Sequence, residues 1–213
     1  VAAQDEAIRA VVAEQEAHGL PIVTDGEYRR LNWQVSFSRV SGWDLWEGAW
    51  RNFLQFPDNL GAGEKPLQRG LDAVESFKAP ATGKLALEDS FPLREYRFLR
   101  QVATRPAKMT LMGPDRVRQM CDIEKSAPHY ADSVSFLADV VAIQRRMVGE
   151  LVDAGCLAIV GPAMTENGFI ARDMAMEFKV PTVIWAAHEK LRSDWSFHFQ
   201  LGSLEEEPVV LLR

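Results

Sequence analysis

Three short apolar segments, each followed by a glycine, constrain the fold of this chain more than any other feature. They span residues 20–24, 107–112 and 157–160, and the glycines that follow are Gly26, Gly113 and Gly161. Amphipathic segments lie between them, so that strand, glycine-containing loop and helix recur in order. This order is typical of βαβ units. The sequence therefore predicts an α/β fold with a mainly parallel sheet.

The helical segments show an apolar period of three to four residues. Helices are predicted over residues 4–18, 92–103, 131–154 and 167–178, with Gly19 and Gly155 as the ends of the first and third. In the helix over 131–154 the predicted buried stripe consists of Val134, Leu137, Ala138, Val141, Val148, Leu151 and Val152. Further strands are predicted over 81–87, 180–185 and 195–201. In the last of these, Trp195 and Phe197 alternate with Ser196 and His198, which predicts a half-buried strand with the latter two on its polar face.

A long segment without a sustained period, residues 31–70, interrupts this order. It contains Trp33, Trp43, Trp46 and Trp50. Loops of this length are usually either functional or disordered, and four tryptophans favour a packed loop. We therefore expect an aromatic-rich excursion whose tryptophans form its own core.

The charge balance limits the partners of the chain. Its 213 residues include 24 basic and 30 acidic ones, and the net charge of −6 argues against a nucleic acid or an anionic membrane as partner. No apolar run approaches the roughly 20 residues that span a bilayer, and the start lacks the basic and apolar regions of a signal peptide. Two cysteines are too few for a disulfide framework. A cytoplasmic protein without a membrane span is expected.

Four motifs in residues 4–156 point to one known family. They are Asp5-Glu6-Ala7-Ile8-Arg9, Thr24-Asp25-Gly26-Glu27-Tyr28-Arg29-Arg30, Lys108-Met109-Thr110-Leu111-Met112-Gly113-Pro114 and Asp153-Ala154-Gly155-Cys156. This part of the chain resembles the cobalamin-independent methionine synthase family, in its short single-barrel homologues of the catalytic domain. The resemblance implies a (β/α)8 barrel that transfers a methyl group from a folate to homocysteine or a related thiol. It also implies zinc and a methyl-folate donor as cofactors of the complete family.

The same resemblance implies a substrate site. Glu27 would hold the amino group of the substrate, and Asp25, Arg29 and Arg30 would form the rim, with Trp33 beside them. Stacking on a pterin ring is the alternative role for the loop tryptophans. The residue pattern alone leaves another interpretation open, in which Asp25 bonds its own backbone in a turn and Glu27 is an exposed partner of one of the arginines.

The sequence lacks the zinc ligands that the resemblance calls for. In that family the ligands are a His-x-Cys pair, a Glu and a further Cys on later strands, and this sequence contains no His-x-Cys pair. Its soft donors, Cys121, His129, Cys156, His188 and His198, match no compact zinc spacing. The family usually has Asp-Glu-Pro where this chain has Ile159-Val160-Gly161-Pro162, and its first barrel strand would precede Val1. No metal site is predicted, and the leading interpretation is an incomplete, inactive methyltransferase.

A second resemblance begins at residue 157. It rests on residues 157–168, 179–185 and 197–208, which contain the strand Leu157-Ala158-Ile159-Val160-Gly161-Pro162. This part is similar to type I periplasmic solute-binding proteins of the branched-chain amino-acid transport class. There, the turn after the Val-Gly-Pro strand opens a helix whose N-terminus receives a ligand carboxylate, which implies a binding role for Thr165. Capping of that helix is the alternative role for Thr165.

Together the resemblances predict a chain in two parts. Residues 1–156 form a partial (β/α)8-barrel-like front that carries the loop 31–70, and residues 157–213 form a βαβ segment of the solute-binding-protein type. A complete barrel needs about 250 residues, so another chain would have to supply strands to complete the sheet. Three functions stay open: a methyltransferase remnant, a non-catalytic amino-acid-binding module, and a truncated or chimeric hybrid with neither activity. The expected ligand is a small-molecule amino acid or thiol.

Overall fold

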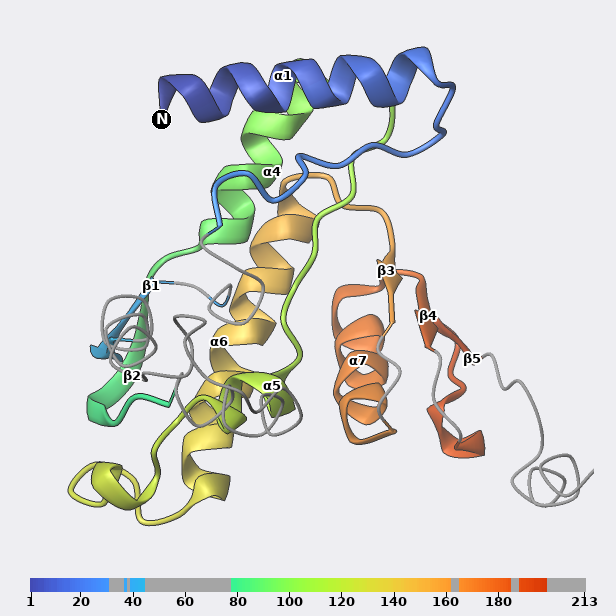
Figure 1. The fold of residues 1–213 in the computed structure, drawn as a ribbon. Helices are drawn as coiled ribbons and strands as arrows, with labels where there is room; N and C mark the ends of the chain where they lie inside the picture. Colours follow the sequence, from blue (N-terminus) through green and yellow to red (C-terminus); the bar gives the residue numbers. More distant parts are fainter. Residues whose placement is uncertain (31–36, 38, 45–77, 162–164, 185–187, 199–213) are drawn as a thin grey trace, which may run out of the picture. The chain divides into compact units, whose positions relative to one another are not determined.

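The computed structural model describes residues 1–30, 37, 39–44, 78–161, 165–184 and 188–198 (Figure 1). They belong to two compact units, Val1–Met147 and Val148–Arg213, whose boundary lies within helix α6 (Ser133–Asp153). The described strands form a two-stranded antiparallel sheet and a three-stranded parallel sheet. This mixture of helices and strands confirms the predicted α/β class, but the described strands form no closed barrel. Most of the predicted excursion 31–70, with Trp33, Trp46 and Trp50, lies outside the described residues.

The first unit contains a small core between two helices. Helix α1 (Ala2–Ala17) lies across the end of α4 (Phe91–Val102), as Figure 1 shows. Ile8 and Val12, one helical turn apart, are buried together with Leu99 of α4. Gly19 follows α1 with φ +74°, a conformation that glycine adopts without strain. Both helices lie where the apolar period predicts them.

The predicted strands 20–24 and 107–112 meet at a single parallel bridge between Val23 and Ala107. The Val23 N–H donates to the Pro106 carbonyl at 3.0 Å, and the Lys108 N–H donates to the Val23 carbonyl at 2.9 Å. No further bridge follows, and on the other edge of the segment the Gln15 side chain binds the N–H and the carbonyl of Thr24, at 3.0 and 2.9 Å. The direction of pairing is therefore as predicted, while the strand lengths are wrong.

A second core in this unit packs a two-stranded antiparallel sheet against α6. Strands β1 (Arg39–Trp43) and β2 (Ala81–Asp89) pair antiparallel, and α5 (Pro114–Gln119) and the short 3-10 helix η3 (Glu124–Ser126) lie between β2 and α6 in the sequence. The Trp43 indole donates to the Ala79 carbonyl at 2.9 Å and meets the Phe136 ring edge-on at 5.1 Å. Trp43 is thus a core residue of this unit, and residues 39–43, predicted as part of a loop without a regular period, form strand β1 instead, because their backbone pairs with β2.

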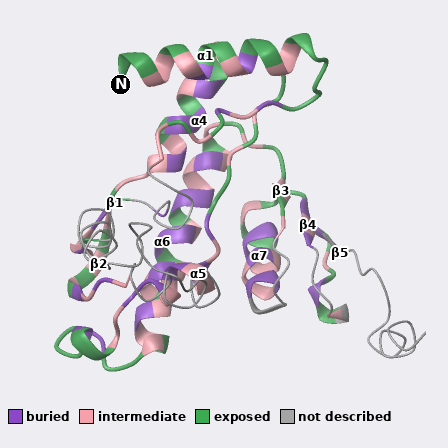
Figure 2. Ribbon diagram, viewed as in Figure 1, coloured by how far each residue is buried: buried purple, intermediate pink, exposed green. Residues whose placement is uncertain are grey.

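Helix α6 confirms the prediction for 131–154, and Val148 and Leu151 of the predicted stripe are buried, but the stripe is wrong over the first half of the helix. Val134 is 72% exposed, whereas Phe136, Val140, Ile143 and Met147 lie in the core. Figure 2 shows buried, intermediate and exposed residues side by side along α6. The face is set by Phe136, whose ring also contacts Tyr130 edge-on at 5.1 Å. Because apolar residues occur around much of this helix, the spacing alone does not say which of them face the core. None of the described helices is both long and apolar enough to cross a membrane.

The second unit is a small parallel sheet with one long helix. Strands β3 (Ile159–Val160), β4 (Thr182–Ile184) and β5 (Ser196–His198) pair in that order, and α7 (Thr165–Phe178) and the 3-10 helix η4 (Glu189–Leu191) connect them. These elements confirm the predicted parallel pairing. Ala171, Ile184 and Leu191 form the core.

The apolar run 157–160 predicts a buried strand, and the alternation in 195–201 predicts Ser196 on a polar face; both predictions are wrong. Leu157 and Val160 are 84% and 74% exposed, because β3 is an edge strand among the described strands and nothing described covers these side chains. Ser196, predicted on the polar face, is buried, because its hydroxyl donates to the Leu191 carbonyl at 2.6 Å. The His198 side chain lies outside the described residues.

Gly42 leads to the first prediction, which concerns the stability of the sheet formed by β1 and β2. It has φ +76°, and a Cβ there would lie 2.4 Å from the Lys84 carbonyl oxygen of β2. Gly19 has a similar φ with no atom within 4 Å of such a Cβ. Gly19→Ala should therefore lower the free energy of unfolding only by left-handed strain, about 1–2 kcal/mol, and Gly42→Ala by clearly more. Urea unfolding measures both, and equal losses would contradict the close approach of the strands.

Asp132 supports a prediction on pH dependence. Its Oδ1 accepts the Ser135 N–H at 2.7 Å at the start of α6, and this bond lowers the pKa of Asp132 below its ordinary 3.8. A lowered carboxyl pKa stabilises the fold above the ordinary value, and this contribution is lost as the pH falls below it. Asp132→Asn keeps an acceptor that does not titrate. Between pH 7 and pH 3 the urea midpoint of the wild type should therefore fall more than that of Asp132→Asn. Equal falls would contradict a stabilising hydrogen bond from the Ser135 N–H to the Asp132 carboxylate.

Candidate functional site

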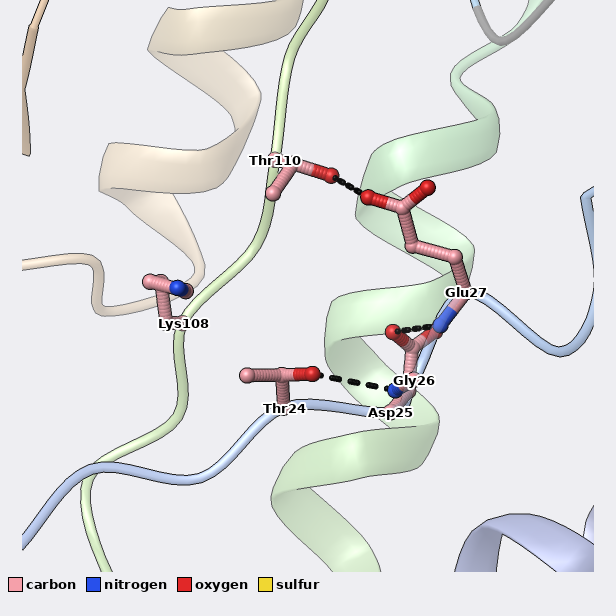
Figure 3. Close-up of a pocket in the computed structure, with 6 residues that line it drawn as sticks. All are labelled: Thr24, Asp25, Gly26, Glu27, Lys108 and Thr110. Carbon is pink, nitrogen blue, oxygen red and sulfur yellow. Dashed lines mark hydrogen bonds between the residues drawn. The ribbon is translucent and has the colours of Figure 1, made fainter. Parts of the chain in front are cut away.

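The described pocket lies where the two bridged segments of the first unit end. It has a volume of about 280 Å³ and is lined by Thr24, Asp25, Gly26, Glu27, Lys108 and Thr110 (Figure 3). The bridge between Val23 and Ala107 determines this composition, because it places the residues that follow each segment side by side. In α/β folds, ligands bind at the carboxyl ends of parallel strands. The pocket therefore occupies the position predicted for a functional site.

The turn Asp25-Gly26-Glu27 has an unusual backbone. Gly26 has φ +67° and Glu27 has φ +58°, so two consecutive residues are left-handed. Two side chains hold the turn: Thr24 Oγ1 accepts the Gly26 N–H and Asp25 Oδ1 accepts the Glu27 N–H, both at 3.0 Å. A left-handed conformation is costly for glutamate, and such strain is found most often at functional sites. The two side-chain hydrogen bonds thus hold Glu27 in a backbone conformation that glutamate by itself does not favour.

Asp25 contains the least satisfied polar atom of the pocket. Its side chain is 3% exposed, and Oδ1 is engaged by the Glu27 N–H. The other carboxylate oxygen, Oδ2, is buried without a hydrogen-bond partner among the described residues. Buried acceptors are normally paired, and leaving one unpaired costs free energy. A ligand with an N–H group would remove that cost.

Arg30 is buried beneath the pocket and connects three segments of the first unit. Its side chain is 2% exposed and that of Glu95, on α4, is fully buried. The guanidinium donates to Glu95 Oε2 from Nη2 at 2.7 Å and from Nε at 3.1 Å. It also donates to the Thr110 carbonyl at 3.0 Å and to the Thr110 hydroxyl at 2.8 Å. The planar group is therefore fixed on two sides, a geometry that suits arginine and not lysine.

The electrostatics near the pocket favour a positive ligand. Burial raises the pKa of Glu95, the Arg30 bonds lower it, and the carboxylates of Asp25 and Glu27 raise it further. The guanidinium contacts the carboxylates of Glu27 and Glu95, and with Asp25 the carboxylates near the pocket outnumber the cations even when Lys108 is included. The excess negative charge attracts a cationic group.

Glu27 faces the pocket and contacts Thr110. Its Oε1 accepts the Thr110 hydroxyl at 2.6 Å and lies 3.6 Å from Arg30 Nη1, and the side chain is about one-third exposed. The structure therefore contains both contacts of the interpretation without a ligand: Asp25 bonds the backbone of its own turn, and Glu27 lies beside Arg30. It also contains a pocket lined by Asp25 and Glu27. The two interpretations do not exclude each other here.

The other sequence-predicted site residues lie elsewhere. Arg29 does not line the pocket, since it pairs with Asp5 of α1 and lies over the Phe98 ring at 4.1 Å. Trp33 lies outside the described residues. Thr165 is the first residue of α7, but its side chain is also outside the description, so its predicted roles stay predictions.

The residues that the structure describes do not fit a zinc ion. Among the described residues, no group of three or more His, Cys, Asp or Glu side chains converges as metal ligands would. Cys121 is a core residue whose thiol lies 3.5 Å from the Ser126 hydroxyl, and burial raises the pKa of this thiol. A raised pKa disfavours the thiolate that zinc binds. We therefore derive no chemical step through zinc for these residues.

Glu95 and Thr110 are the site residues that sequence reasoning missed. Glu95 stands on the buried face of α4, with Pro92 and Leu99 one turn away on either side. A charge at a core position of an amphipathic helix needs a buried partner, and this was the available signal. For Thr110 the sequence offered no signal beyond its place in a motif, because its role comes from contacts with residues about 80 positions away.

Comparison with known proteins bears on the fold. No family model matches the sequence. Over 154 residues the chain is 26% identical to the uncharacterized protein YxjH of Bacillus subtilis strain 168, covering 72% of this chain and 37% of that protein. It is also similar to the structure of a B12-independent methionine synthase from Shewanella sp. W3-18-1 in complex with selenomethionine. The TM-score is 0.52 at 19% identity, covering 85% of this chain and 50% of that one.

The described fold is methionine synthase-like. The match of 85% corresponds to about 181 of the 213 residues, so the likeness extends past residue 156, where the second resemblance begins. The resemblance of 157–213 to solute-binding proteins is not supported by these matches and stays a prediction. The chain spans half or less of the length of both proteins.

The Arg30–Glu95 pair leads to a stability prediction. Removing one member of a buried ion pair leaves an uncompensated charge, so Glu95→Ala should lower the free energy of unfolding by about 3–5 kcal/mol. The exposed pair of Arg94 and Asp89, 2.7 Å apart, is the control, and Asp89→Asn should cost less than about 1 kcal/mol. Urea unfolding compares the two variants, and a similar small loss from both would contradict a buried pair.

Proposed function

We propose that the pocket binds the amino-acid part of a thiol substrate, in a protein that transfers a methyl group from a folate to homocysteine or a related thiol. The observation that carries this proposal is the buried Oδ2 of Asp25, an acceptor without a donor, beside the Glu27 carboxylate. The methionine synthase-like fold supports the same choice of ligand. Both residues belong to the motif from which the resemblance was drawn.

An α-amino acid offers the groups that this pocket lacks. Its ammonium group has three N–H donors, which suit Asp25 Oδ2 and the carboxylate of Glu27. Hydrogen bonds between an ammonium group and carboxylates are stronger than neutral ones. Lys108 lies across the pocket from Glu27 (Figure 3) and supplies a positive charge for the ligand carboxylate. The pocket thus presents acceptors and a cation on opposite sides, as recognition of a zwitterion requires.

The proposal assigns these residues binding and no step of methyl transfer. In the family that the sequence resembles, zinc makes the thiol nucleophilic, and its ligands lie on later strands. The donors among the described residues do not fit that ion. The chain spans half of the methionine synthase that it resembles in fold, and the proposal assigns no thiol-activating group to the described residues. We propose no function for Thr165, because no described contact favours one.

Calorimetric or NMR titration with small ligands tests this proposal. L-Methionine should bind, whereas 4-(methylthio)butanoic acid, which lacks only the ammonium group, should bind at least about tenfold more weakly. This factor corresponds to one lost hydrogen bond between charged groups. Equal affinities would show that the carboxylates do not hold the ammonium group, and no binding of L-methionine would reject the proposal.

Substitutions at the two carboxylates give a second test. Asp25→Asn and Glu27→Gln should each weaken L-methionine binding about tenfold or more, while Glu88→Gln, which changes an exposed carboxylate of β2, should not. Glu27→Asn is informative because asparagine tolerates a left-handed backbone better than glutamate. This variant should unfold at the same or a higher urea concentration than the wild type and still lose affinity. A loss of stability with full affinity would contradict the assignment of Glu27.

A further inference from the structure

Thr110 lies between Arg30 and Glu27 and bonds to both. Its hydroxyl oxygen accepts Arg30 Nη1–H at 2.8 Å and its proton is donated to Glu27 Oε1 at 2.6 Å. A hydroxyl has one proton, and a guanidinium can only donate. The direction of both bonds is therefore determined: the Thr110 proton must point to Glu27.

The group behind Thr110 has little freedom to move. Arg30 is 2% exposed, and the fully buried Glu95 binds its guanidinium edge. The Thr110 carbonyl accepts from the same guanidinium at 3.0 Å, so backbone and side chain of Thr110 are both held. Glu95, Arg30, Thr110 and Glu27 thus form one chain of hydrogen bonds from the buried face of α4 to the pocket.

The chain of bonds ends at one oxygen of Glu27. Oε1 is engaged by Thr110, whereas Oε2 has no hydrogen-bond partner among the described residues. Figure 3 shows the carboxylate with one oxygen directed to Thr110 and the other turned away from it. An exposed glutamate normally samples several rotamers, and holding one of them before binding reduces the entropy that the ligand must offset.

We propose that Thr110 is a positioning residue for Glu27, and that Arg30 and Glu95 act through it. Thr110 holds Oε1 and orients the Glu27 carboxylate toward the ammonium group of the ligand. This inference rests on the proposed function, because it assumes that Glu27 binds an ammonium group. It differs from a structural role for Thr110, which would affect stability without depending on Glu27.

Two variants of Thr110 separate these roles. Thr110→Val removes the hydroxyl at nearly constant volume, and Thr110→Ser retains it. With L-methionine as the probe, Thr110→Val should raise the dissociation constant about fivefold to tenfold, the effect of one net hydrogen bond, and Thr110→Ser should stay within about twofold. Ser41→Ala removes a hydroxyl of β1 that bonds to the Ala86 carbonyl, and it should leave the affinity unchanged. NMR titration follows all constants into the millimolar range.

The decisive measurement repeats Thr110→Val in a Glu27→Gln background. If Thr110 acts through the Glu27 carboxylate, its removal should have less than a twofold effect there. An equal effect in both backgrounds, or equal losses from Thr110→Val and Thr110→Ser, would overturn the positioning role. Thr110→Ala serves as the hydroxyl deletion if Thr110→Val does not fold.

The two proposals fail in different ways. If the wild type does not bind L-methionine, the proposed function is rejected and the inference falls with it. If the wild type binds and Thr110→Val binds equally well, the inference alone is rejected.

Discussion

The buried guanidinium of Arg30 is the constraint on which the pocket depends. It bonds to Glu95 of α4 and to both the carbonyl and the hydroxyl of Thr110, so one side chain joins segments that are 65 and 80 residues from it in the sequence. Such a pair is a poor source of stability, because desolvation offsets much of the attraction between the charges. Its effect is geometric instead. It determines where Thr110 stands, and Thr110 contacts Glu27.

The same region shows how a strand that ends early makes room for a site. Gln15 of α1 binds both backbone groups of Thr24 on the edge away from Ala107, and the parallel pairing does not continue beyond Val23. The chain then turns through two left-handed residues and presents Asp25 and Glu27 instead of continuing a ladder. The pocket that results is acidic, and no group of metal-ligating side chains converges among the described residues.

Much of the fold was predictable, because local patterns carry it. The helices α1, α4, α6 and α7 and the parallel pairing of β3, β4 and β5 follow from apolar periods and glycine positions. The buried face of α6 was predictable only in part: Val148 and Leu151 are buried as predicted, whereas Phe136 takes the core position that spacing had given to Val134. Ser196 was misplaced for a related reason: period-two alternation does not reveal that a hydroxyl has a buried carbonyl to bind. Within the site, Asp25, Glu27 and Arg30 were found from one contiguous motif, whereas Glu95 and Thr110 were not.

The sequence by itself determined the helices α1, α4, α6 and α7, the parallel direction and the acidic turn at 25–27, because each depends on neighbouring residues. Only the tertiary structure decided that Arg30 is buried against Glu95, that Arg29 lies outside the pocket, and that Asp25 has an oxygen without a donor. Burial and hydrogen-bond partners depend on residues that are distant in the chain, and a single sequence carries no direct record of those distances. The chemistry of the pocket is therefore a property of the fold, although the residues that perform it stand in a recognisable motif.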